Sequence, residues 1–105
     1  MLGEPRKNDN EKPRTDLLPP RALVEVAKVF GYGAEKYGDW NWSLGKGLPA
    51  SRVYAAALRH LFAWWSGEDK DQETGVTHLA HAACSVLMLL DLMLRGGIDD
   101  RPSRA

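Results

Sequence analysis

The sequence predicts a small all-α domain, and three observations support that fold class. Apolar residues recur at helical spacing in three stretches, glycine and proline separate those stretches, and no segment alternates apolar and polar residues convincingly enough for a strand. A length of 105 residues is typical of one domain, so residues 1–105 are expected to form a single helical unit.

The two ends of the chain are polar. Residues 1–18 are rich in proline and charge and are expected to form an extended basic arm, while residues 98–105 form a polar tail. The arm has no apolar run of the kind found in secretory signals. The longest apolar stretch, residues 82–94, contains Ser85 and Asp91 and is too short to cross a bilayer. We therefore expect no membrane partner and a cytoplasmic location.

A first helix is expected to begin at Pro19 and Pro20, because proline suits the first helical turn. Its apolar face is formed by Ala22, Leu23, Val26, Val29 and Phe30. Gly31 and Gly33 are expected to end this helix, with one short turn over residues 34–37 after them.

The elements expected next are a loop over residues 38–50, a helix over 51–65, an acidic loop over 67–76 and a helix over 78–95. Ser51 and Thr77 are the predicted N-caps, because a side-chain oxygen at that position accepts a bond from a free helical N–H. Gly67 and the Gly96–Gly97 pair are expected to end the two helices.

The second and third expected helices are apolar nearly all round. Three helices of this size cannot bury both of them, so the remaining surface predicts a partner, most simply a second copy. We expect helical hairpins paired in a homodimer or homotetramer. The single cysteine, Cys84, lies in an apolar run and is expected to be a small buried residue.

The charges of the chain cancel, with 14 basic and 14 acidic residues. This balance argues against a broad nucleic-acid surface, so no nucleic-acid partner is expected. The balance hides an asymmetry, because residues 4–21 have an excess of basic side chains and residues 66–73 are acidic.

Imidazoles and carboxylates are expected to converge where the acidic loop joins the two helices. His78 and His81 share one face of the third helix, and His60 lies near the end of the second. If the helices pack antiparallel, these rings approach the acidic loop, and the mixed donor set suits Mn²⁺ or a tolerant Mg²⁺ site. The alternative interpretation is structural, with hydrogen-bonded core histidines beside a solvated loop.

Cations and aromatic rings elsewhere are candidates for binding a phosphorylated small molecule. The basic arm leads into a helix N-terminus, where free N–H groups attract anions. The loop over residues 38–50 contains two tryptophans, Trp40 and Trp42, either of which could stack on a base. A solvated arm and a tryptophan that fills the core are the alternatives. The candidate substrate-binding residues are Lys12, Arg14, Lys36, Tyr37, Asn41, Trp42 and Arg59.

Several blocks of the sequence together resemble a known family. They are residues 7–14 (KNDNEKPR), 16–19 (DLLP), 33–38 (GAEKYG) with Asn41-Trp42, 56–60 (AALRH), 67–68 (GE), 71–75 (DQETG) and 78–82 (HLAHA). This order of blocks resembles the phage and bacterial dATP/dGTP diphosphohydrolase domain, a MazG-like branch of the all-α nucleoside triphosphate pyrophosphohydrolases. The resemblance covers nearly the whole chain.

The resemblance implies an α-helical oligomer that cleaves a purine deoxynucleoside triphosphate, dGTP or dATP, between its α and β phosphates. The products would be the monophosphate and pyrophosphate, and Mg²⁺ or Mn²⁺ would be required. A phage-encoded enzyme of this kind would act in the host cytoplasm.

One departure from the family pattern concerns the metal. Typical MazG-like enzymes bind Mg²⁺ through a Glu-x-x-Glu and a Glu-x-x-Asp on successive helices, whereas this chain places Tyr54 and Ala57 at the first pair and His78 and His81 at the second. The sequence-based hypothesis therefore takes Glu68, Asp71, His78 and His81 as metal ligands, with His60 and Glu73 as further ligands or proton carriers.

The sequence also allows two other functions. An HD-type nucleotide phosphohydrolase is also helical and uses His and Asp ligands, although the chain contains no His-Asp dipeptide. A non-catalytic helical module for nucleotide binding or assembly is the second alternative.

Overall fold

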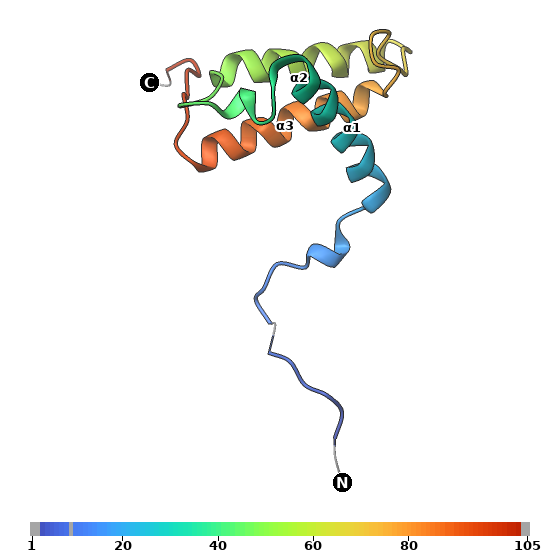
Figure 1. The fold of residues 1–105 in the computed structure, drawn as a ribbon, viewed down its shortest axis with the longest axis vertical. Coiled ribbons are helices and arrows are strands. Elements are labelled where there is room, and N and C mark those ends of the chain that lie inside the picture. The colour runs from blue at the N-terminus through green and yellow to red at the C-terminus, as the bar shows by residue number, and fades with distance from the viewer. Residues whose placement is uncertain (1–2, 9, 104–105) are drawn as a thin grey trace.

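The computed structural model describes residues 3–8 and 10–103 and contains three α-helices (Figure 1). They are α1 (Pro20–Tyr37), α2 (Ala50–Trp65) and α3 (His78–Leu94), with short 3₁₀ turns η1 (Thr15–Leu17) and η2 (Asn41–Ser43). The described residues form no strand, and Lys70 and Thr77 make only an isolated bridge. The all-α prediction is therefore confirmed.

Helices α2 and α3 form an antiparallel hairpin, and α1 packs across α3 (Figure 1). The centre of the α1–α3 contact is built from Val26, Val76, Ala80 and Cys84. These side chains are small, so the helices approach closely and the core has little room for aromatic residues. The largest fully buried side chain among the described residues is that of Leu92.

The predicted end of the first helix is wrong. Gly31 and Gly33 lie inside α1, which continues through residues 34–37 and ends at Gly38, whose φ is 99°. A glycine within a helix costs about 1 kcal/mol relative to alanine, which weakens a helix but does not break it. Packing of Val29 and Phe30 against α3 stabilises this part of α1.

The predicted N-cap of α2 is also wrong. Pro49 occupies the cap position, and no side chain of the preceding turn caps the helix. Instead the backbone N–H of Ser51 donates to Oδ1 of Asp100 over 2.8 Å, and the Ser51 hydroxyl donates to Oδ2. The N–H of Ala50 donates to the carbonyl of Ile98 over 2.9 Å. The start of the predicted polar tail thus serves as the cap of α2, while residues 104–105 lie outside the described part.

The start of α3 agrees with prediction. The hydroxyl oxygen of Thr77 accepts a hydrogen bond from the N–H of Leu79 over 3.3 Å. Gly67 follows α2 with a φ of 104° and Gly96 follows α3 with a φ of 76°, as expected for residues that end helices.

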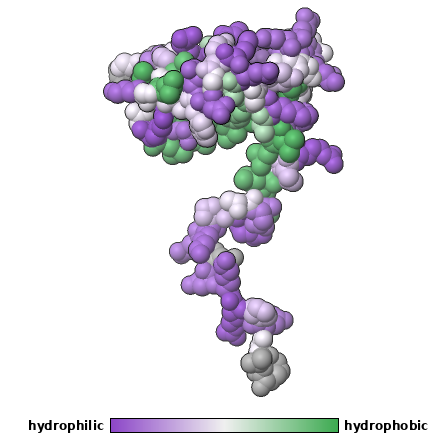
Figure 2. Space-filling model, in the orientation of Figure 1, coloured by the Kyte–Doolittle hydropathy of each residue, from purple (hydrophilic) through white to green (hydrophobic). Residues whose placement is uncertain are grey.

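The N-terminal arm leads away from the helical body and is exposed throughout its described residues (Figure 1). Residues 1–2 and 9 of the predicted arm lie outside the described residues. The radius of gyration is 17.8 Å, larger than the roughly 13 Å of a compact chain of this length. Where the arm joins α1, Leu17, Leu18, Leu23 and Val24 form an exposed apolar surface (Figure 2).

Within the described ranges, none of the helices combines the length and the apolar character needed to cross a membrane.

Candidate metal centre and adjoining pocket

Three histidines from two helices meet at the end of the hairpin that carries the acidic loop. His60 comes from α2, and His78 and His81 come from the first turn of α3. The Nδ1 atoms of His60 and His78 lie 2.9 Å apart. The rings of His60 and His81 are stacked, with centroids 4.5 Å apart and planes inclined by 15°.

The acidic loop holds Asp71 against this cluster through its own hydrogen bonds. Oδ2 of Asp71 accepts from the N–H of Thr74 over 2.9 Å and from its hydroxyl over 3.1 Å. The same hydroxyl oxygen lies 2.7 Å from Nε2 of His81. Because the single hydroxyl proton of Thr74 points to Asp71, His81 donates its Nε2 proton to Thr74. Thr74 therefore fixes both the carboxylate of Asp71 and the tautomer of His81.

One donor atom each from His60, Asp71 and His78 lie within 4.8 Å of one another. His78 is 6% exposed, and its Nε2 is buried without a hydrogen-bond partner in the described part of the chain. Oε2 of Glu68 lies 3.2 Å from this nitrogen without forming a hydrogen bond to it. Two imidazoles and a carboxylate with a spare buried donor atom fit a divalent transition ion such as Mn²⁺ or Zn²⁺.

The electrostatic environment favours the neutral form of His60 and His81 and the charged form of Asp71. Burial, followed by the neighbouring imidazoles, lowers the pKa of His60. Burial also lowers the pKa of His81, and the charge of Asp71 only partly opposes this effect. Burial alone would raise the pKa of Asp71, but hydrogen bonds from Thr74 and the nearby imidazoles outweigh it, so the pKa is lowered. Neutral imidazole and ionised carboxylate are the forms that bind metal.

Cys84 is not a candidate ligand. Its side chain is buried in the α1–α3 contact, and burial raises the pKa of its thiol to about 12. Metal coordination and nucleophilic attack both need the thiolate, which is not formed near neutral pH at such a position.

Two residues expected in the site are paired with each other at its edge. Nζ of Lys36, from α1, lies 2.7 Å from Oε1 of Glu73 in the acidic loop, and both side chains are more than half exposed. This ion pair connects the C-terminal end of α1 with the acidic loop. Arg59 is exposed on α2 beside His60.

The two arm residues expected to bind substrate do not approach the histidine cluster within one chain. Lys12 is exposed, and Arg14 forms a two-bond pair with Asp16, at 2.9 and 2.8 Å. The arm leads away from the helices, so a contact between it and the cluster needs a different placement of the arm or a second copy (Figure 1).

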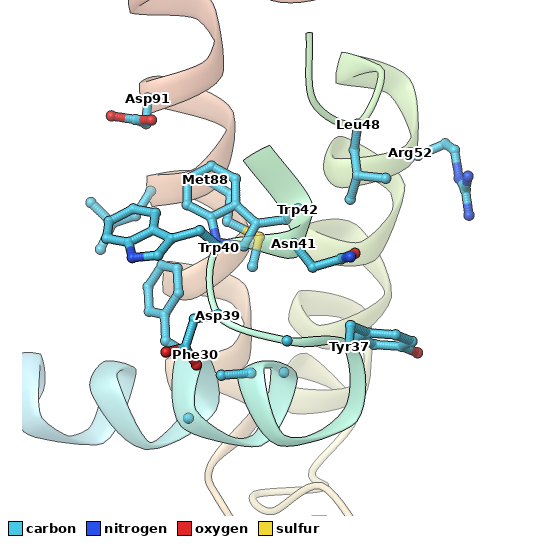
Figure 3. A pocket seen from close by; sticks show the side chains of 15 residues that line it. Phe30, Tyr37, Asp39, Trp40, Asn41, Trp42, Leu48, Arg52, Met88 and Asp91 are labelled. Carbon is cyan, nitrogen blue, oxygen red and sulfur yellow. The ribbon is translucent and has the colours of Figure 1, made fainter. Parts of the chain in front are cut away.

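A pocket of about 830 Å³ lies between the C-terminal half of α1, the η2 loop and α3 (Figure 3). Among the predicted substrate-binding residues, it brings together Tyr37, Asn41 and Trp42. The predicted substrate-binding residues do not include the pocket residues Arg52 and Asp91. The sequence pattern places Arg52 on one face of its helix with Arg59, beside His60, and it favours a structural role for Asp91.

Comparison with known proteins identifies the family of the chain. A curated relative named dATP/dGTP diphosphohydrolase, from Salmonella phage PMBT28, is 38% identical over 96 residues. The match covers 90% of this chain but 32% of the relative, so the chain spans about a third of that protein's length. No solved structure matches the chain significantly. The family model described as dATP/dGTP diphosphohydrolase, N-terminal, matches residues 3–101. The chain therefore belongs to the dATP/dGTP diphosphohydrolase N-terminal family.

Proposed function

We propose that this chain carries out metal-dependent hydrolysis of purine deoxynucleoside triphosphates, releasing the monophosphate and pyrophosphate. The observation that carries the proposal is the convergence of His60, Asp71 and His78 in a chain of this family. Nε2 of His78 belongs to this cluster and has no hydrogen-bond partner among the described residues. A divalent ion bound there would polarise phosphate oxygens and lower the pKa of a bound water.

We propose His60, Asp71 and His78 as the residues that hold the ion, with Glu68 as a neighbouring carboxylate. His81 then supports the site through a chain of hydrogen bonds. Its Nε2–H donates to the hydroxyl oxygen of Thr74, and that hydroxyl donates to Asp71. Residues that hold a metal ligand in place by hydrogen bonds commonly change metal affinity by about 10- to 100-fold. The Lys36–Glu73 pair would place a cation and a second carboxylate at the edge where phosphates approach.

The fourfold negative charge of a triphosphate favours this arrangement over a covalent mechanism. Cleavage of such a substrate needs charge neutralisation and alignment of the attacking water rather than a protein nucleophile. The buried, protonated thiol of Cys84 is poorly suited to act as one. His60 and His81 each have a ring nitrogen that takes part in a hydrogen bond close to the proposed metal site, so either ring could carry a proton during the reaction.

Product analysis tests the proposal. The four common deoxynucleoside triphosphates are incubated with the chain and either Mg²⁺ or Mn²⁺, and products are resolved by anion-exchange chromatography. Pyrophosphate and a purine monophosphate are expected. Inorganic phosphate or triphosphate would indicate an HD-type phosphohydrolase, and no turnover with any metal would indicate a non-catalytic module.

A matched pair of variants shows whether the turnover belongs to this site. Asp71→Asn is expected to abolish activity, because the amide cannot supply a charged ligand. Asp69→Asn makes the same chemical change two residues earlier, at an exposed side chain outside the cluster, and is expected to retain activity.

A further inference from the structure

The pocket beside η2 has an aromatic wall. The rings of Trp40 and Trp42 lie 5.8 Å apart, and Phe30 lies 6.1 Å from Trp42, in tilted arrangements. Figure 3 shows the two indoles beside Met88 of α3, with Asn41 and Tyr37 on the side nearer α2. A volume of about 830 Å³ is in the range of small-molecule sites, and a mostly apolar lining with a few polar groups is typical of them.

Trp40 occupies a backbone position that disfavours it. The N–H of Asn41 donates to the carbonyl of Gly38 over 3.2 Å, which closes a turn with Trp40 at its third residue. Its φ of 61° and ψ of 15° belong to the left-handed region, where glycine or asparagine is preferred. The side chain is 69% exposed. An exposed indole on a disfavoured backbone contributes little to folding, so a role in binding explains it better.

Asp91 supplies a carboxylate that the fold does not use. It is the only aspartate, glutamate, lysine or arginine of α3, and it lines the pocket from the α3 side. Asp91 is exposed, and within the described residues its carboxylate forms no hydrogen bond or ion pair with another side chain, in contrast to the carboxylates of Asp71, Asp99 and Asp100. The other acidic residue of the pocket, Asp39, lies in the turn, where aspartate is common for local reasons.

The pocket and the histidine cluster lie along one stripe of α2. Arg52 lines the pocket, and Ala56 and His60 follow it at i+4 and i+8. Eight residues of helix correspond to about 12 Å. Ala56, between Arg52 and His60, has a small side chain and is half-buried. A nucleotide extended along this stripe could place its base in the pocket while its phosphates reach the metal centre.

We propose that the pocket binds the purine base of the substrate, with Trp40 stacked on its face and Asp91 selecting guanine over adenine. Guanine presents two adjacent donors, N1–H and the 2-amino group, which one carboxylate accepts together. Adenine presents an acceptor at N1, which a carboxylate repels. This inference rests on the proposed function for the identity of the ligand and names the base that the site prefers.

Calorimetric titration with dGMP and dAMP in the presence of EDTA tests the inference without requiring metal or turnover. The chain is expected to bind dGMP more tightly than dAMP. Trp40→Gly should weaken both about tenfold while Tm is unchanged or higher, because glycine suits the left-handed turn position. Asp91→Asn should reduce the ratio of the two affinities about tenfold, and Asp99→Asn, outside the pocket, should not change it.

Three outcomes would overturn the inference. Unchanged nucleotide binding with a lowered Tm in Trp40→Gly would make the indole a structural residue. Loss of guanine preference in Asp39→Asn but not in Asp91→Asn would move the recognition to the turn. Tryptophan fluorescence that responds to dilution of the protein and not to dGMP would show that a second copy covers the pocket. Since hydrolysis is measured separately by its products, failure here leaves the proposed reaction standing.

Discussion

The Nδ1 atoms of His60 and His78 lie 2.9 Å apart, so one ring donates a proton that the other accepts. A cation binds an imidazole nitrogen through that nitrogen's lone pair. In this pair one lone pair is replaced by the proton and the other accepts it, so a bound cation must disrupt the hydrogen bond. Metal and proton therefore compete for this pair, and His60 is already positioned by its stacking on His81. The pair is thus a point at which metal binding and protonation are coupled.

Removing a proposed ligand should weaken metal binding. His78→Asn and Asp71→Asn are each expected to lower the affinity for Mn²⁺ by at least about tenfold, because each removes one donor of a three-residue set. Electron paramagnetic resonance of free Mn²⁺ measures this directly. Asp69→Asn, which keeps the set intact, is the control.

Alanine substitutions separate the roles of the loop and the rings. If Glu68→Ala and Asp71→Ala both retain full Mn²⁺ affinity and full turnover, the acidic loop is only surface and the proposed centre is wrong. If His78→Ala and His81→Ala retain affinity while the carboxylate variants lose it, the carboxylates alone hold the ion and the histidines support them.

Acid should destabilise the metal-free fold in a defined pH range. The folded state lowers the pKa of His60 and of His81, mainly by burial, so below the ordinary histidine value of 6.5 the unfolded chain takes up protons first. The stability present above pH 6.5 is therefore lost as pH falls toward the folded values. Thermal melts in EDTA should show Tm falling between pH 7 and pH 5.

His60→Gln provides the comparison for this pH dependence, because it removes one titrating ring whose neighbours are His78, His81, Asp71 and Arg59. Its Tm should fall less steeply over the same range. Parallel Tm profiles for the two proteins would mean that His60 does not contribute to the effect.

The class and order of the helices could be predicted from the sequence, because helical spacing and the Thr77 cap are local signals. The end of α1 could not, since Gly31 and Gly33 resemble helix stops locally while contacts of Val29 and Phe30 with α3 maintain the helix. The cap of α2 could not either. Asp100 is 49 residues from Ser51, and no local pattern reveals such a partner.

The site was partly predictable for the same reason. The acidic loop and the paired histidines of α3 are close in sequence, so their proximity followed from an antiparallel hairpin. The choice among ligands depends on side-chain directions. Thr74 lies against Nε2 of His81, whereas Nε2 of His78 has no hydrogen-bond partner in the part of the chain that the structure describes. The pocket lies between α1, η2 and α3, so its residues could be identified only from the arrangement of these elements in the fold.

The cap supplied by Asp100 should contribute to stability. Asp100→Ala removes the acceptor for the N–H and hydroxyl of Ser51 and is expected to lower Tm by a few degrees. Asp99→Ala is the matched control, because the carboxylate of Asp99 forms a surface ion pair with the exposed Arg101. Equal Tm values for the two variants would contradict a capping role.

The basic arm should bind the triphosphate even though it leads away from the cluster in one chain. Changing Lys12 and Arg14 together to alanine is expected to raise KM strongly and leave the melting curve unchanged, because both residues are exposed. Unchanged kinetics would mean that the arm is a solvated tail. Mixing this double variant with His78→Asn tests whether the arm acts on a second copy, since recovered activity requires a site assembled from both chains.

Self-association is the last prediction, and its basis is apolar surface that three helices leave uncovered. Tyr54 and Phe62 of α2 are 56% and 66% exposed, and Leu90 and Leu94 of α3 are 53% and 78% exposed. Single exposed apolar residues are ordinary, but rows of them along two helices are typical of interfaces.

Light scattering at micromolar concentration should give a multiple of the 11.7 kDa chain mass, and Phe62→Glu or Leu90→Glu should reduce it. Leu44 is 66% exposed but lies in a loop outside these rows, so Leu44→Glu serves as the control and should leave the mass unchanged. A stable monomer of the unmodified chain would refute the prediction, and an equal loss of mass in the loop variant would show a nonspecific effect of charge.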